Sequence, residues 1–429
     1  MGAKTKARPT GFRPASLDAL NFLLADVSGA VGPYLNVFLV TQQHWSQSYV
    51  GLVTTVGGLL GLLVRTPIGA LIDATPAKRG LVVAMLTGVS AAAVTIFVLP
   101  FFWPVLIANS LMAVAGDVFG PAVASITLGV VGWAALAPRM GRNAAFDHAG
   151  NVAIAVAAGA VGYIFSQRAV FLLVPVFSVL AAAAVLSIPY GAIDLDRARG
   201  LGDGEAEAEE ELKGERKPSG YRVLLQSRPL VVFAVCAMLF HLANAPLLPL
   251  VGQKLAQAHP PWATAMMSSC IVAAQLIMVP IALLVGRKAD SWGRKPILLV
   301  GFAILPLRAV LYTFSDAAPW LIGVQLLDGV GAGIFGALTP LVVADVMRGT
   351  GRYNVALGLV GTLQGIGASS SGLVTGEIVD HFGYSAAFLT SGAVACAALA
   401  ALFLAMPETA PGHEHDAFLA GSGHTGARG

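Results

Sequence analysis

The sequence predicts an all-α protein that crosses a membrane many times, and three observations support this prediction. Hydrophobic residues make up 56% of the 429 positions and charged residues only 11%, less than half the charged share of an ordinary soluble domain. Windows of about 19 residues are apolar enough to enter lipid along most of the chain. A basic, glycine-bearing motif at 286–296 lies between two long apolar runs, and a weaker copy occupies 69–79. Each copy follows the second run of a six-run block, so we expect two similar halves.

The spacing of the apolar runs predicts the individual helices. A helix needs about 20 residues to cross a hydrocarbon core of about 30 Å, and this measure divides each half into six spans, with the two motifs as loops. In the first half we expect spans near 17–40, 49–72, 80–101, 104–131, 143–165 and 170–188. In the second half we expect them near 230–255, 262–285, 297–314, 320–347, 353–379 and 386–406.

The polar segments predict the domain boundaries. The first 16 residues have no cleavage pattern of a signal peptide, so they are expected to be a cytoplasmic tail. The run of glutamates within 205–211 favours a solvated linker between the halves. The expected domains are a tail at 1–16, a bundle at 17–190, a linker at 191–228, a bundle at 229–406 and a tail at 407–429.

Lysine and arginine predict the orientation. Nearly all of the 26 basic residues lie in the tails and in the loops after even-numbered spans, whereas the opposite loops hold only Arg168 and Lys254. Because short cytoplasmic loops are enriched in Lys and Arg, we expect both termini in the cytoplasm and a multi-pass protein of the inner membrane.

The internal repeat resembles the major facilitator superfamily (MFS). Beyond the motifs, 118–121 matches 334–340, and 141–143 matches 351–354. The signature loop of that family reads roughly Gly-x-Leu-Ala-Asp-Arg-x-Gly-Arg-Arg. The second copy fits at Gly286, Ala289, Asp290, Gly293, Arg294 and Lys295, and the first keeps Gly69, Leu71, Asp73, Lys78 and Arg79 but has Ala74 and Pro76 at basic and glycine positions. The resemblance implies 12 transmembrane helices in two pseudo-twofold-related six-helix bundles.

The motif also predicts a cytoplasmic gate. Glycine allows close helix approach, and basic residues bridge to carboxylates on other helices. The alternative explanation is that Lys and Arg lie in these motifs only because cytoplasmic loops are enriched in cations. That enrichment does not account for the carboxylates Asp73 and Asp290. The expected gate residues are Gly69, Asp73, Lys78, Arg79, Gly286, Asp290, Gly293, Arg294, Lys295, Asp345 and Arg352.

Charges within the spans are the candidates for coupling, because each costs at least about 2.5–3.5 kcal/mol to insert. Asp26 and Arg65 match in depth and are expected to face each other, as a structural pair or a proton-coupled switch. Asp117 is the best single candidate for a protonatable or cation-binding carboxylate. Arg308 and Asp328 also match in depth and predict a fixed ion pair. The coupling candidates are therefore Asp26, Arg65 and Asp117.

Polar residues within the spans, above all in the first span of each half, are candidates to line a central cavity. His241 falls near the counterpart of Asp26 in the other half, and Pro246 and Pro249 are expected to loosen its helix. A histidine that is only hydrogen-bonded within its helix is the alternative. The cavity candidates are Asp26, Asn36, Asp117, Asn151, His241, Asn244, Gln275 and Gln364.

These features predict a secondary active transporter that moves a small solute by alternating access, with proton coupling and export favoured. No phosphate-binding loop, cofactor site, nucleic-acid site or pattern of enzyme residues was found, and a monomer in the lipid bilayer is expected. One alternative is an exporter of a divalent metal or metal chelate, for which Asp26, His241, Asn244 and Cys236 offer ligands. An alternative of another class is a non-transporting membrane sensor with the same fold.

Overall fold

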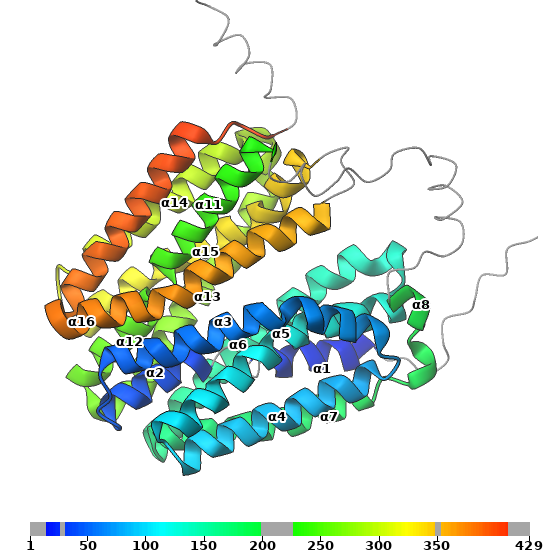
Figure 1. Ribbon diagram of the computed structural model, residues 1–429, viewed down its shortest axis with the longest axis horizontal. Coiled ribbons are helices and arrows are strands. Elements are labelled where there is room, and N and C mark those ends of the chain that lie inside the picture. Colours follow the sequence, from blue (N-terminus) through cyan, green and yellow to red (C-terminus); the bar gives the residue numbers. More distant parts are fainter. Residues whose placement is uncertain (1–13, 26–30, 199–225, 348–352, 411–429) are drawn as a thin grey trace, which may run out of the picture. The chain divides into compact units, whose positions relative to one another are not determined.

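The computed structural model describes residues 14–25, 31–198, 226–347 and 353–410, and within these ranges every regular element is a helix (Figure 1). The chain divides into two compact units. The first unit comprises Met1–Trp45, Val53–Glu215 and Pro260–Ser268, and the second comprises Ser46–Leu52, Arg216–His259 and Ser269–Gly429.

In the first unit, α1 packs against α6 and α7, and α4 packs against α5 and α7. The helices are α1 (Pro14–Ala25), α2 (Val31–Thr41), most of α3 (Gln47–Ala74), α4 (Lys78–Val98), α5 (Phe102–Val131), α6 (Trp133–Ile164), η2 (Gln167–Leu172), α7 (Leu173–Leu186), η3 (Tyr190–Ala192) and α8 (Leu195–Ala198). The short helix η4 (Pro260–Trp262) and the first turns of α13 also belong to this unit.

In the second unit, α16 packs along α11 and α14, and α14 also packs against α15 (Figure 1). The helices are α11 (Arg228–Asn244), α12 (Leu247–Ala258), most of α13 (Ala263–Trp292), α14 (Arg294–Leu311), α15 (Ala318–Val346) and α16 (Tyr353–Ala405).

The helices confirm the predicted architecture of 12 membrane crossings. Among the described residues, nine stretches are long and apolar enough to cross a membrane. The longest, Val355–Ala405, contains two crossings, because Gly383 breaks the helix with a φ of +82°. α14 is not one of the nine because three cations, at its two ends, make it less apolar. The first crossing is described in two parts, α1 and α2.

The two signature motifs are more helical than expected. α13 runs without a break through 286–292, and the chain turns only at Gly293. No glycine or proline lies between Arg287 and Trp292, so the helix continues past the apolar core with Arg287 and Lys288 exposed. In the first half, α3 runs to Ala74 and ends two residues before Pro76, as the steric effect of proline on the preceding residue requires. The prediction of loops at 69–79 and 286–296 was therefore wrong for most of their length.

The seventh span is interrupted where its prolines predicted it. α11 ends at Asn244 and α12 begins at Leu247, with Pro246 at the break. Proline removes one backbone donor and crowds the preceding turn. The side chain of Asn244 is therefore placed at the end of a helix within the apolar region.

The chain after the sixth span stays packed on α5. The backbone N–H of Asp194 donates to the Gly129 carbonyl at 3.0 Å, and the Ser125 hydroxyl donates to the Ala198 carbonyl at 2.5 Å. Ile193 is 8% exposed. The segment assigned to the linker thus starts with an ordered stretch, whereas its glutamate run lies outside the described residues.

Candidate functional site

A buried polar cluster lies in the second unit where α11, α14 and α15 meet. Arg308 of α14 forms an ion pair with Asp328 of α15, which confirms the predicted pair, and their side chains are 2% and 16% exposed. Arg308 Nη2 donates to Asn244 Oδ1 at 2.8 Å. Gln325 Nε2 donates to Asp328 Oδ2 at 3.0 Å, and the Tyr312 hydroxyl donates to Gln325 Oε1. We refer to these five residues as the Arg308 cluster.

Hydrogen bonds within the Arg308 cluster offset part of the cost of holding two charges away from water. Taking an ion pair out of water costs several kcal/mol per ion, and the attraction offsets this cost only when further hydrogen bonds satisfy the groups. Asn244 and Gln325 each supply one such bond, whereas Arg308 Nε is buried without a hydrogen-bond partner among the described residues. Sequence reasoning placed Asn244 in a cavity and missed Gln325 and Tyr312. The spacing of Gln325 three residues before Asp328 on one helix was an available signal.

His241 has the geometry of a histidine bonded within its own helix. Its Nδ1 lies 3.0 Å from the carbonyl oxygen of Ala237, one turn earlier in α11. Its ring meets Phe335 edge-on, with the centroids 4.9 Å apart, and it lies against Phe240. Phe240 stacks on Phe335 with a centroid distance of 5.0 Å. The hydrogen bond within its helix is therefore observed, beside an aromatic cluster, and the place of His241 in a cavity stays a prediction.

The remaining cavity candidates lie in several places. Asn36 of α2 is 8% exposed, and its Oδ1 has no hydrogen-bond partner among the described residues. Gln275 Oε1 of α13 is also buried without a partner in that part of the chain. Asn151 Nδ2 donates to the Asp147 carbonyl at 3.0 Å. Asp117 is half-buried at the middle of α5.

Close packing surrounds Asp117. A Cβ added to Gly61 of α3 would lie 2.7 Å from Asp117 Oδ2, so the carboxylate occupies space that only glycine leaves free. Gln364 is half-buried in α16. Asp26 and the side chain of Arg65 lie outside the described residues, so their expected pairing stays a prediction.

In the second unit the signature motif is held by Arg294 at the start of α14. Its side chain is only 5% exposed. Arg294 Nε donates to Asp345 Oδ2 of α15 at 3.0 Å, and Arg294 Nη1 lies 2.7 Å from Asp290 Oδ1 of α13. These contacts join three helices of one unit. Arg352 lies outside the described residues.

Glu408, which sequence reasoning missed, caps the same helix. Its Oε1 accepts the backbone N–H of Arg294 at 2.8 Å, and its Oε2 accepts that of Lys295 at 3.1 Å. A carboxylate at a helix N-terminus satisfies amides that lack partners within the helix and interacts favourably with the helix dipole. The segment after α16 is thereby attached to the motif.

The pH dependence of this cap follows from the pKa of Glu408. Burial raises the pKa, but hydrogen bonds from the amides of Ala410, Arg294, Lys295 and Thr409 outweigh burial and hold it below its ordinary value of 4.5. A carboxyl whose pKa is depressed by folding stabilises the fold above the unfolded pKa and loses that contribution as pH falls through the folded pKa. We expect thermal unfolding temperatures to fall more steeply below pH 4.5 for the wild type than for Glu408→Gln. Parallel pH profiles would contradict this prediction.

The two motif glycines have different surroundings, although both were expected to permit close approach. Gly293 has a φ of +83°, and an added Cβ would lie 2.6 Å from Glu408 Oε2. Gly286 has nothing within 4 Å of the corresponding position, so the expected role of Gly286 in close packing was wrong.

This contrast gives a matched pair of variants. Gly293→Ala is expected to reduce the free energy of unfolding by about 1–3 kcal/mol, because alanine is strained at positive φ and collides with the cap. Gly286→Ala is expected to be neutral or stabilising by up to about 1 kcal/mol, because it lies inside a helix with free space. Chemical denaturation in detergent measures both. Equal effects would contradict the assignment.

The first copy of the motif is fixed by backbone carbonyls. The ammonium of Lys78, a residue only 1% exposed, donates to the Ile72 carbonyl at 2.8 Å. Arg79 Nη1 donates to the Ile188 carbonyl at 2.5 Å, and the guanidinium lies 5.2 Å from the centre of the Tyr190 ring. The surroundings of Gly69 and the side chain of Asp73 lie outside the described part of the structure.

The first unit also contains a buried charge cluster around Asp18, another residue that sequence reasoning missed. Asp18 Oδ1 of α1 accepts Arg139 Nη2 at 2.7 Å, and Asp18 Oδ2 accepts Arg142 Nη2 at 2.7 Å. Asn143 Oδ1 accepts Arg139 Nε at 2.8 Å, and Asn143 Nδ2 donates to Thr127 Oγ1 at 3.1 Å. The similarity of Gly-Arg-Asn at 141–143 to Gly-Arg-Tyr-Asn at 351–354 was the available signal.

Among the described residues, no three or more His, Cys, Asp or Glu side chains lie close enough together to hold a metal. Asn244 bonds to Arg308, and Cys236 is fully buried. The described part of the chain therefore gives no support to a metal-binding site.

The comparisons with known proteins agree with this architecture. Residues 18–305 and 230–425 match the Major Facilitator Superfamily. An uncharacterised MFS-type transporter of Mycobacterium tuberculosis is 50% identical over 92% of this chain and 93% of its own length. The methyl viologen resistance protein SmvA of Salmonella typhimurium is 28% identical over 27% of this chain and 23% of its length.

A solved structure has the same fold. The crystal structure of the nucleoside transporter NupG superposes with a TM-score of 0.72 at 13% identity, over 91% of this chain and 98% of that one. Together with the family match and the similarity along almost the whole of the mycobacterial relative, this places the chain in a family of multi-pass membrane transporters. The chain belongs to the major facilitator superfamily.

Proposed function

We propose that the protein is a proton-coupled secondary transporter that exports a small solute across the inner membrane by alternating access, with both termini in the cytoplasm. The observation that carries the proposal is the Arg308 cluster at the break between α11 and α12. Charged groups within a membrane are costly and mark solute or ion pathways. The second half therefore has charged and polar groups within its membrane-spanning helices, and we place the solute pathway beside them.

Asp117 is the proposed carrier of the coupling proton. It lies at the middle of α5, half-buried, with Gly61 leaving room for its carboxylate. Desolvation favours the neutral form of a carboxyl, whereas a nearby cation favours the ionised form. A change in solvent access during transport would thus drive proton uptake and release. Export is supported by the relative named for methyl viologen resistance, and the orientation by the distribution of Lys and Arg.

The proposal is tested by proton movement in inside-out membrane vesicles. Respiration acidifies the vesicle interior, a pH-sensitive dye reports the internal pH, and methyl viologen is added together with a panel of cationic, neutral and anionic metabolites. An exchanged compound is expected to raise the internal pH in vesicles with the wild type. Asp117→Asn is expected to abolish this response, whereas Asp316→Asn, a change at a carboxylate 78% exposed outside the spans, leaves it intact.

Two outcomes would contradict the proposal. Transport that continues without a proton gradient would exclude proton coupling. If no compound in the panel moves, yet some raise the unfolding temperature of the purified protein, the non-transporting sensor becomes the better explanation.

A further inference from the structure

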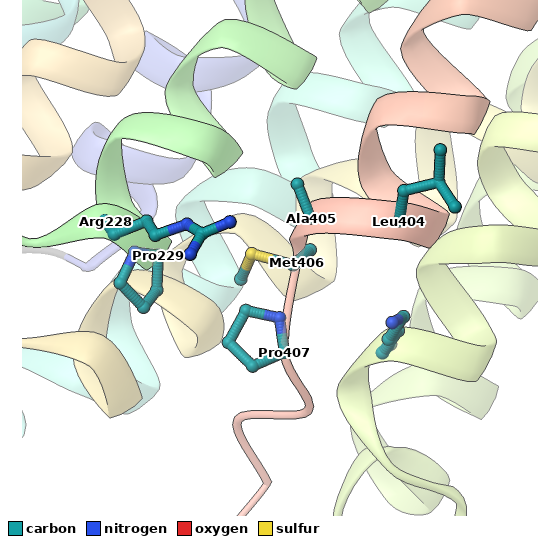
Figure 2. Close-up of a pocket in the computed structure, with 7 residues that line it drawn as sticks. Arg228, Pro229, Leu404, Ala405, Met406 and Pro407 are labelled. Atoms are coloured by element: carbon teal, nitrogen blue, oxygen red, sulfur yellow. The ribbon is translucent and has the colours of Figure 1, made fainter. Parts of the chain in front are cut away.

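A cavity of about 390 Å³ lies at the ends of α11, α14 and α16, within the second unit. Figure 2 shows Arg228 and Pro229 on one side and the final turn of α16, with Met406 and Pro407, on the other. Lys295 of α14 also lines it. The proposed transport mechanism gives this cavity no role.

The cavity combines two cations that lack ion-pair partners in the described part of the chain. Arg228 is exposed and is the first residue of α11, and Lys295 is the second residue of α14. The Lys295 ammonium lies 5.7 Å from the centre of the Phe403 ring. Arg228 begins α11, so the partial positive charge of that helix end adds to that of the side chains, whereas the first amides of α14 are occupied by Glu408.

The carboxylate of Glu408, which lies at the start of α14, is already engaged by backbone amides. Glu408 accepts backbone N–H groups of Arg294, Lys295, Thr409 and Ala410, so its charge is compensated by amides. The side chains of Arg228 and Lys295 form no salt bridge with Glu408 or with any other carboxylate among the described residues. A cavity of this charge favours an anion.

The neighbouring surface is apolar and belongs to a helix that crosses the membrane. Leu404 is 80% exposed and Phe403 is 60% exposed at the end of α16. A free anion would make no use of these side chains, whereas hydrocarbon chains would cover them. Basic pockets at the inner end of membrane helices are typical sites for acidic lipid headgroups.

We propose that this cavity binds the headgroup phosphate of an anionic phospholipid. Arg228 and Lys295 contact the phosphate, and the acyl chains lie along Leu404 and Phe403. In the orientation proposed above, the lipid belongs to the cytoplasmic leaflet. The proposal concerns lipid binding, so its outcome is independent of whether transport is coupled to protons.

The test is retention of lipid by the purified protein. The full chain is delipidated in detergent and titrated with phosphatidylglycerol or phosphatidylcholine, and bound lipid is counted by native mass spectrometry. Phosphatidylglycerol is expected to bind preferentially. The double variant Arg228→Gln/Lys295→Gln is expected to weaken this binding about tenfold or more, since each basic residue near an acidic lipid contributes about 1 kcal/mol. Arg287→Gln/Lys288→Gln removes the same charge from exposed positions of α13 outside the cavity and is the control.

The alternatives have distinct outcomes. Equal weakening by both double variants would mean that only net charge attracts the lipid, and the assigned site would be wrong. Binding of inorganic phosphate or glycerol 3-phosphate as tightly as phosphatidylglycerol would identify a free-anion site and overturn the lipid assignment. If the double variant does not fold, Arg228→Gln alone decides, because this side chain is exposed and a wild-type affinity would refute its contact with the phosphate.

Discussion

Arg308→Met is expected to reduce the free energy of unfolding by about 3–5 kcal/mol, because it leaves Asp328 in the membrane interior without its cation. It also removes the donor to Asn244 Oδ1 at the end of α11. Methionine preserves most of the volume of the arginine stem, so a packing defect contributes little. Chemical denaturation in detergent measures the change.

Two control variants distinguish the cost of leaving Asp328 without a cation from the cost of removing the whole ion pair. Arg308→Met/Asp328→Leu removes both charges and is expected to recover most of the stability, because replacing a whole buried ion pair by apolar residues is often neutral. Arg287→Met changes an exposed arginine of α13 and is expected to alter stability by less than about 0.5 kcal/mol. A loss below about 1 kcal/mol for Arg308→Met would show that the cluster does not stabilise the second unit.

Asp18→Asn is expected to cost about 2–4 kcal/mol in the first unit. The substitution leaves Arg139, which is 8% exposed, with a neutral partner in place of a carboxylate. Arg142 is 56% exposed and can turn to water, so most of the cost arises at Arg139. The loss is expected to be smaller than for Arg308→Met, because an asparagine oxygen can still accept one of the bonds.

Asp316→Asn is the matched control for this prediction. Asp316 also pairs with a cation, Lys254, which is 16% exposed, but the carboxylate itself is 78% exposed, so the pair is open to water on one side and is expected to contribute less than a pair buried on both sides. The difference between the two variants therefore reports burial and not pairing alone. If Asp18→Asn and Asp316→Asn have equal effects on the denaturation midpoint, the Asp18 cluster is not a stabilising element.

The parts of the fold that could be predicted from the sequence follow from local physics. A lipid core requires long apolar helices, so the spans are visible in composition alone. The pair of Arg308 and Asp328 could be predicted because two charges at equal depth on successive helices have few other partners. The break before Leu247 could be predicted because proline acts on its own helix.

The remainder depends on contacts between distant segments. Glu408 lies 114 positions from Arg294 in the sequence, and Asp18 lies 121 from Arg139. No spacing rule connects such residues. Tyr312 and Gln325 similarly acquire their roles only when α14 and α15 are packed together. The motif at 286–296 was recognised by residue type, but its helical continuation to Trp292 depends on the absence of a breaker before Gly293.

The cap on α14 has a consequence for the order in which the protein matures. Ribosomes add about 5–20 residues per second, and Glu408 is made 114 residues after Arg294. The backbone amides at the start of α14 are therefore synthesised on the order of 10 s before the carboxylate that caps them. During that interval these amides donate to water or to another acceptor. The cap of α14 therefore forms only after the segment that follows α16 has been synthesised.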